Sequence, residues 1–231
     1  MEKKEELKKQ AAHKAVEEIQ SGMVVGLGTG STVFYALQKI SELIKTGKLE
    51  NIVGIPSSKQ TEKIANELEI PLTTFEEHKT IDVTIDGADE VDKYLNLIKG
   101  GGGALLHEKV LAQASKKLVI VVDESKLSSK LGTRWAVPIE VIKFAYPLEI
   151  KFLKTLAGEP ELRMYENLEE PLLTDEGNYI IDTNFGVIGN PLELASKLES
   201  RAGIVEHGLF LRMASKIIVA GEDGIKIMEK K

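Results

Sequence analysis

The feature that most constrains the fold is a regular alternation of two sequence patterns between residues 5 and 122. Short apolar runs, typical of buried strands, occur at residues 23–27, 52–56, 81–85 and 117–122. Stretches with helical spacing of apolar residues occur at residues 5–20, 32–45, 104–115 and in a segment that ends near Leu68. This order predicts an α/β fold with a parallel-rich sheet covered by helices on both faces.

A different order follows Leu131. Strand patterns at residues 135–142, 161–165, 179–185 and near Ile204 are interrupted by helix patterns at residues 146–156 and 191–199. That β-α-β-β-α-β order predicts a ferredoxin-like unit. Two further strands, at residues 216–220 and 224–228, complete the chain. We therefore expect a main domain of residues 1–131 and 206–231, and an inserted α+β domain of residues 132–205.

Composition excludes several classes of function. The net charge of −6 argues against broad nucleic-acid binding, which normally needs a basic patch. The chain has no cysteine, and its four histidines show no metal-ligand spacing, so we expect no metal site. It has no apolar run long enough to span a membrane, and its N-terminus is a mixed-charge amphipathic helix rather than a signal peptide. We expect no membrane partner and a cytoplasmic location.

The first glycine loop, residues 28–32, lies between a predicted strand and a predicted helix. Helix N-termini attract anions, and the hydroxyls of Thr29, Ser31 and Thr32 suit a phosphate or a sugar hydroxyl. The loop lacks the Gly-Lys-Ser/Thr ending of a Walker A loop and the third glycine of a dinucleotide fingerprint. With Gly30 it would serve equally well as a simple helix cap.

A DGAD tetrad, Asp86-Gly87-Ala88-Asp89, directly follows the predicted strand at residues 81–85. Ligand sites of parallel sheets lie beyond the carboxyl ends of the strands. The two carboxylates could orient sugar hydroxyls, tune each other's pKa or hold a metal. The structural alternative is an Asx turn with a helix cap, in which Glu90 and Asp92 are simply solvated.

The glycine run, Gly100-Gly101-Gly102-Gly103 behind Lys99, is the strongest local feature. Consecutive glycines are entropically costly, but they let the backbone amides approach a ligand closely. Glu108 follows just inside a predicted helix. The helix N-terminus would lower the pKa of Glu108 and burial would raise it, so that it could act as a base near neutrality. Otherwise Glu108 merely complements the helix dipole.

Lys126 follows the strand pattern at residues 117–122 and could bind a phosphate or a hydroxyl, or be an ordinary turn lysine. Acids, lysines and glycine amides at strand ends together favour a small, anionic, oxygen-rich ligand, such as a sugar phosphate.

Four segments in this order, GLGTGST, DGADE, KGGGG with ALLHEK, and DESK, resemble the type A ribose-5-phosphate isomerase family. The resemblance covers essentially the whole chain, and only Gly103 departs from it, where a larger small residue is expected. It implies a Rossmann-like main domain with an inserted α+β domain. It also implies interconversion of ribose 5-phosphate and ribulose 5-phosphate in the pentose phosphate pathway, without metal or cofactor, by a homodimer or homotetramer.

The resemblance also assigns roles to residues. Glu108 would be the proton acceptor, with Lys99, Asp86 and Asp89 as the other catalytic residues. The substrate-binding residues would be Thr29, Gly30, Ser31, Thr32, Asp86, Gly87, Ala88, Asp89, Lys99, Gly100, Gly101, Gly102 and Lys126.

Two other classes of protein stay open at this stage. A sugar-phosphate-sensing module would share the architecture, but it would need a DNA-reading domain. A CoA transferase would use a glutamate as nucleophile, and a covalent glutamyl thioester would reveal it.

Overall fold

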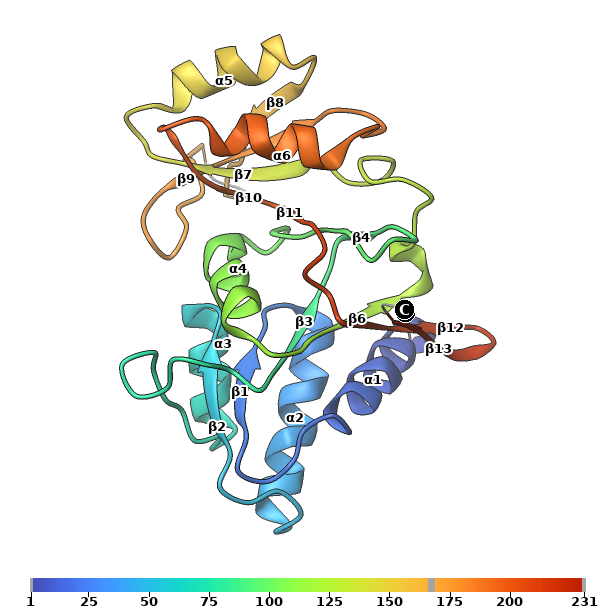
Figure 1. The fold of residues 1–231 in the computed structure, drawn as a ribbon. Coiled ribbons are helices and arrows are strands. Elements are labelled where there is room, and N and C mark those ends of the chain that lie inside the picture. The colour runs from blue at the N-terminus through green and yellow to red at the C-terminus, as the bar shows by residue number, and fades with distance from the viewer. Residues whose placement is uncertain (1, 166–168, 230–231) are drawn as a thin grey trace. The chain divides into compact units, whose positions relative to one another are not determined.

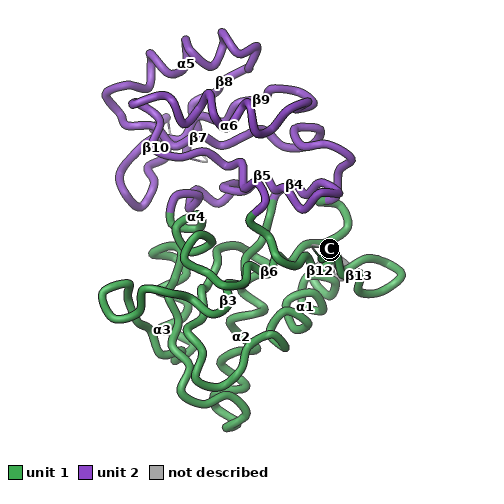
Figure 2. The backbone as a smooth tube through the Cα atoms, viewed as in Figure 1, with its two compact units in different colours: residues 1–88, 107–126, 213–231 green, residues 89–106, 127–212 purple. Residues whose placement is uncertain are grey.

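The computed structural model describes residues 2–165 and 169–229 (Figure 1). The chain forms two compact units (Figure 2). Unit 1 comprises residues 1–88, 107–126 and 213–231, and unit 2 comprises residues 89–106 and 127–212. This division differs from the predicted domain boundaries, because residues 89–106, 127–131 and 206–212 also belong to unit 2.

Unit 1 is built on a six-stranded sheet with the order β13-β12-β6-β3-β1-β2. Its strands are β1 (Val24–Leu27), β2 (Val53–Pro56), β3 (Val83–Gly87), β6 (Leu118–Asp123), β12 (Lys216–Gly221) and β13 (Gly224–Glu229). All neighbours pair in parallel except β12 and β13, which form an antiparallel hairpin. The parallel-rich sheet is therefore confirmed.

Helices cover both faces of this sheet, as predicted. They are α1 (Glu2–Val16), α2 (Ser31–Lys45), α3 (Lys59–Glu67) and α4 (Leu105–Ala114), whose first two residues belong to unit 2. Successive side chains of a strand point to opposite faces of a sheet. Accordingly, Val25 packs with α1 and α2, whereas its neighbour Val24 packs with Leu111 of α4.

A four-stranded antiparallel sheet with two helices forms most of unit 2. Its elements are β7 (Val137–Val141), α5 (Tyr146–Thr155), β8 (Glu159–Leu162), β9 (Tyr179–Asn184), α6 (Pro191–Glu199) and β10 (Ile204–His207). The sheet order β10-β7-β9-β8 is that of the ferredoxin-like fold, so this prediction is confirmed. Strand β8 starts two residues earlier than predicted, since Pro160 is tolerated on an edge strand.

A three-stranded sheet in unit 2 was not predicted. It consists of β4 (Glu90–Val91), β5 (Leu97–Ile98) and β11 (Leu209–Phe210), in the order β11-β5-β4. Two-residue strands are too short to show any periodicity in the sequence. The sheet places the glycine run directly after β5.

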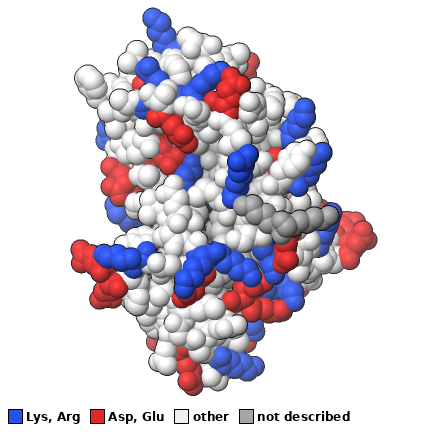
Figure 3. Space-filling model, in the orientation of Figure 1, with Lys and Arg blue, Asp and Glu red and all other residues white. Residues whose placement is uncertain are grey.

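Acidic and basic side chains are interspersed on the face of the molecule shown in Figure 3. Among the residues that the structure describes, no helix is long and apolar enough to cross a membrane.

Candidate active site

Three neighbouring parallel strands of unit 1 end beside predicted site residues. The first glycine loop follows β1, Asp86 and Gly87 end β3, and Lys126 ends the short 3-10 helix η1 (Glu124–Lys126) that follows β6. Strand β3 extends to Gly87, so Asp86 belongs to the strand rather than to a turn. The carboxyl edge of this sheet is where parallel sheets place their ligands.

The hydroxyl of Thr29 is directed into unit 1 by a chain of hydrogen bonds. It donates to Ser58 Oγ at 2.8 Å, Ser58 donates to Thr61 Oγ1 at 3.0 Å, and Thr61 donates to the carbonyl of Gly28 at 2.9 Å. Ser57 Oγ lies 2.8 Å from Thr29 Oγ1 and donates to it, because the Thr29 proton is already used. This hydroxyl therefore fixes the loop and has no proton left for a ligand.

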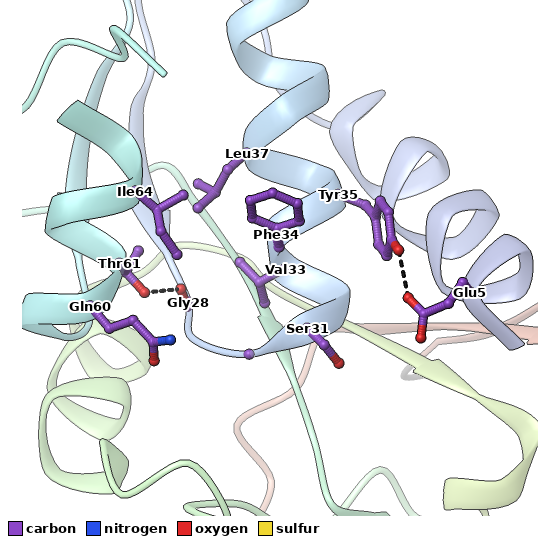
Figure 4. A pocket seen from close by; sticks show the side chains of 11 residues that line it. Glu5, Gly28, Ser31, Val33, Phe34, Tyr35, Leu37, Gln60, Thr61 and Ile64 are labelled. Atoms are coloured by element: carbon purple, nitrogen blue, oxygen red, sulfur yellow. Dashed lines mark hydrogen bonds between the residues drawn. The ribbon is translucent and has the colours of Figure 1, made fainter. Parts of the chain in front are cut away.

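The next residues of the loop lie at the N-terminus of α2. Gly30 is the N-cap residue and has no side chain, while Ser31 and Thr32 begin the helix. A cavity of about 340 Å³ opens beside them between α2 and α3 (Figure 4). Its polar lining residues include Glu5, Ser31, Gln60 and Thr61, and its apolar ones include Val33 and Ile64. Amide donors of this helix end suit an anion.

Asp86 is buried against the first glycine loop. Its Oδ1 accepts hydrogen bonds from the N–H of Thr29 at 3.2 Å and of Gly87 at 2.8 Å. A Cβ added at Gly28 would lie 2.6 Å from the carbonyl oxygen of Ile85 and nearer still to the Asp86 carboxylate. Glycine is required at residue 28 for this close approach.

Asp89 plays the same part in unit 2. Its Oδ2 accepts a hydrogen bond from the N–H of Gly101 at 2.7 Å. A Cβ added at Gly101 would lie 2.7–2.9 Å from three atoms of this carboxylate group. The structure thus brings Asp89 together with the glycine run, as it brings Asp86 together with the first glycine loop.

Lys99 precedes the glycine run and is buried. Its backbone N–H donates to the carbonyl of Gly208 at 2.9 Å, and its Nζ lies 5.4 Å from the centre of the buried Phe210 ring. A cation over an aromatic face is stabilised by the ring quadrupole. The β11-β5-β4 sheet therefore fixes Lys99 from both its backbone and its side chain.

Glu108 lies in the first turn of α4 and is 4% exposed. It belongs to unit 1, with Lys126, whereas Lys99 and Asp89 belong to unit 2. The chain connects the two groups covalently, since it passes between the units at Ala88–Asp89 and again at Leu106–His107. Burial opposes the charge of a carboxylate, and a helix N-terminus favours it.

The alternative that Glu90 and Asp92 are simply solvated is wrong. Both are buried. Glu90 accepts hydrogen bonds from the four backbone amides of residues 132–135 at 3.0–3.2 Å, and Asp92 accepts from Tyr94 and Asn96. They organise loops of unit 2. In the described ranges, no group of three or more histidine or acidic side chains is arranged to hold a metal ion.

No sequence pattern pointed to Arg163, which donates hydrogen bonds to the carbonyls of Gly100 and Gly101. It sits in no motif, and its carboxylate partner Asp182 is 19 residues away. The only available signal was a lone arginine within the strand predicted at residues 161–165.

Similarity to known proteins extends over nearly the whole chain. Residues 53–224 match the family described as ribose 5-phosphate isomerase A (phosphoriboisomerase A). Ribose-5-phosphate isomerase A of Desulfatibacillum aliphaticivorans is 57% identical over 223 residues, which cover 96% of each chain.

Solved structures give the same result. A D-ribose-5-phosphate isomerase in complex with phospho-erythronic acid has a TM-score of 0.96 at 42% identity, covering 98% of this chain and 99% of the other. Ribose 5-phosphate isomerase from Plasmodium falciparum has a TM-score of 0.94 at 46% identity, with the same coverage. The chain belongs to the ribose 5-phosphate isomerase A family.

Proposed function

We propose that this chain interconverts D-ribose 5-phosphate and D-ribulose 5-phosphate through an enediolate. The observation that carries the proposal is the family match, together with a relative of that name that is 57% identical over almost the whole chain. The comparisons give no support to a sensing module or a CoA transferase.

Glu108 is the proposed proton carrier. Its carboxylate takes the proton from C2, the C–H electron pair forms the C1=C2 bond, and negative charge moves to the carbonyl oxygen at C1. Glu108 then returns the proton to C1 while the proton of the O2 hydroxyl passes to O1, so that O2 becomes the new carbonyl and O1 becomes a hydroxyl. One carboxylate suffices because the two carbons are adjacent, and its burial in the first turn of α4 supports this role.

Donors aimed at the developing charge stabilise the transition state, each being worth roughly 2.7–4 kcal/mol. The Lys99 ammonium and the amides of the glycine run, residues 100–102, are the proposed donors. Asp86 and Asp89 bind sugar hydroxyls and assist ring opening. Their hydrogen bonds to the two glycine segments support this proposal, because they hold both carboxylates in defined positions.

The phosphate is proposed to bind at the N-terminus of α2, where Gly30, Ser31 and Thr32 lie. The inward hydroxyl of Thr29 favours a structural role for that side chain. Lys126, which also follows a neighbouring strand end, supplies positive charge to the same ligand. Phosphate binding then supplies remote binding energy that orients the sugar for reaction.

We also propose that the enzyme works in the cytoplasm, without metal or cofactor, as a homodimer or homotetramer. The sequence resemblance supports the metal-free and cofactor-free reaction and the oligomeric state. Light scattering measures the oligomeric state, and turnover is expected to persist in the presence of a chelator.

The central test is Glu108→Gln, assayed by conversion of ribose 5-phosphate to ribulose 5-phosphate. Loss of a general acid–base residue typically costs about 10²–10⁴-fold in rate, and we expect a loss of that size or greater. Binding of phospho-erythronic acid should persist, which would show that the site is intact.

Glu193→Gln is the matched control, because Glu193 is an exposed glutamate in the first turn of α6. It should retain full turnover. Near wild-type turnover of the Glu108→Gln variant would overturn the mechanism, and failure of the wild type to convert ribose 5-phosphate would overturn the function.

A further inference from the structure

The backbone of the glycine run is held by one half-buried arginine. Nη1 of Arg163 donates hydrogen bonds to the carbonyl of Gly100 at 2.9 Å and to that of Gly101 at 3.1 Å. The side chain of Arg163 is 14% exposed. Since charge-assisted hydrogen bonds are stronger than neutral ones, both carbonyls are firmly directed toward the guanidinium.

Arg163 is itself fixed on three sides. Its Nε donates to Asp182 Oδ2 at 2.7 Å and its Nη2 to Asp182 Oδ1 at 2.5 Å, which is a bidentate pair. Its backbone N–H donates to the carbonyl of Ile180 at 2.9 Å, and its carbonyl accepts from the N–H of Leu172 at 2.9 Å. Arg163 is therefore anchored to the β8–β9 region. Its guanidinium in turn holds the carbonyls of the glycine run.

The planar peptide bond links the direction of these carbonyls to the direction of the next N–H groups. In a planar trans peptide, the N–H of a residue points opposite to the carbonyl of the residue before it. With the carbonyls of Gly100 and Gly101 aimed at Arg163, the N–H groups of Gly101 and Gly102 point away from it. The observed hydrogen bond from the Gly101 N–H to Asp89 agrees with this direction.

We infer that Arg163 is a positioning residue for the isomerisation. It sets the direction of the Gly101 and Gly102 amides, of which the first orients Asp89 and the second donates to the negatively charged oxygen of the enediolate. This inference rests on the proposed function of the glycine run. The guanidinium also polarises both peptide groups, so that their N–H groups become better donors.

Lysine cannot replace arginine in this position. Only a planar guanidinium with five donors can bind a carboxylate through two nitrogens and two carbonyls through a third. Arg163→Lys keeps the positive charge but loses either the Asp182 fork or the two carbonyl contacts, so it tests geometry rather than charge.

The chain offers a matched control in the same unit. Arg201 forms a similar bidentate pair with the buried Glu149, at 2.9 and 3.1 Å, and its other neighbour is the ring of Phe152. Arg201→Lys therefore loses a comparable bidentate pair whose hydrogen bonds do not reach the glycine run. Any loss of stability should be similar in the two variants.

The first readout separates kcat from KM. Arg163→Lys should lower kcat by about 10- to 100-fold, a part of what complete removal of an oxyanion donor costs, while KM changes by less than about threefold. Arg201→Lys should leave both parameters near wild type. Where Arg163→Lys fails to fold, Asp182→Asn weakens the same clamp and should lower kcat by about three- to tenfold.

The second readout needs no turnover. In protein labelled with [15N]glycine, the amide resonances of Gly101 and Gly102 should move in Arg163→Lys or Asp182→Asn and stay in place in Arg201→Lys. Unmoved resonances, or equal kcat values in the two lysine variants, would overturn the inference. Moved resonances in a protein whose wild type does not isomerise ribose 5-phosphate would instead reject the proposed function and leave the positioning of the run intact.

Discussion

The two glycine-rich segments, residues 28–32 and residues 100–103, are held in place by different kinds of side chain. Besides Asp86, the first glycine loop in unit 1 is fixed by a chain of hydroxyl groups from Thr29 through Ser58 and Thr61. The glycine run in unit 2 is fixed by an ion pair, with Arg163 and Asp182 behind it. Glycine provides the close approach in both places, but it does not determine what directs the amides.

One tetrad serves both segments. Asp86 accepts from the backbone at Thr29, and Asp89, three residues later, accepts from the backbone at Gly101. DGAD therefore connects the two glycine segments through its two carboxylates. Each carboxylate fixes one glycine segment, and the two segments differ in how much they can adjust.

Gly28→Ala should distort the first glycine loop and give the largest loss of stability of these variants. The new Cβ would lie 2.6 Å from the backbone oxygen of Ile85, which cannot move without distorting β3. Overpacking of this kind costs about 1–3 kcal/mol, and we expect the upper end of that range. Urea denaturation measures the free energy of unfolding. A loss under about 0.5 kcal/mol would show that β3 adjusts more easily than we infer.

Gly101→Ala should separate activity from stability. The three atoms nearest to its Cβ would all belong to the carboxylate end of Asp89, at 2.7–2.9 Å, and that end can rotate away. We expect turnover to fall about tenfold, because Asp89 leaves its position, with less than about 1 kcal/mol of destabilisation.

Gly189→Ala is the control for that variant, since a Cβ at Gly189 meets nothing within 4 Å. It should leave both turnover and stability unchanged. Unaltered turnover in Gly101→Ala would show that the position of Asp89 is not critical.

The smallest expected change in stability concerns an ion-paired carboxylate of unit 1, Glu18, whose hydrogen bonds go to lysines outside the first glycine loop. Glu18 bonds to Lys117 and Lys216, and these hydrogen bonds hold the pKa of the Glu18 carboxyl below its ordinary value of 4.5. A carboxyl with a lowered folded-state pKa stabilises the fold above its unfolded pKa, and this contribution disappears as the pH falls through the folded value.

Glu18→Gln should therefore lower the free energy of unfolding at pH 7 by less than about 1 kcal/mol. The difference from wild type should stay constant down to about pH 5 and then shrink. Denaturation curves between pH 7 and pH 3 measure it, with the exposed neighbour Glu17→Gln as control. A difference that grows on acidification would contradict this account.

Much of the fold could be predicted because its elements carry periodic patterns. Residues 118–122 of β6 are all apolar, and α2 repeats apolar residues at helical spacing, so the sheet and its covering helices follow from the sequence. The ferredoxin-like order followed in the same way. Strands β4, β5 and β11 could not be predicted, because each has only two residues and depends on tertiary pairing.

The chemical types of the site residues were readable, but their orientations were not. The sequence singled out the hydroxyl of Thr29 as a ligand group, whereas three hydroxyl side chains of the following segment, residues 57–61, draw it inward. Arg163 escaped detection for a related reason. Its role depends on contacts with residues 62 and 63 positions away in sequence, which no local pattern encodes.

The small β11-β5-β4 sheet has a consequence for recombination between homologous genes. Two of its strands precede α4 in the chain, and the third follows the whole ferredoxin-like segment. In a chimaera that exchanged residues 137–207 alone, β5 and β11 would both come from the recipient parent. The imported segment would then lie next to a sheet from the other protein. The natural unit of exchange is therefore two gene fragments transferred together, residues 89–106 and 127–212, with residues 107–126, which include most of α4, retained between them.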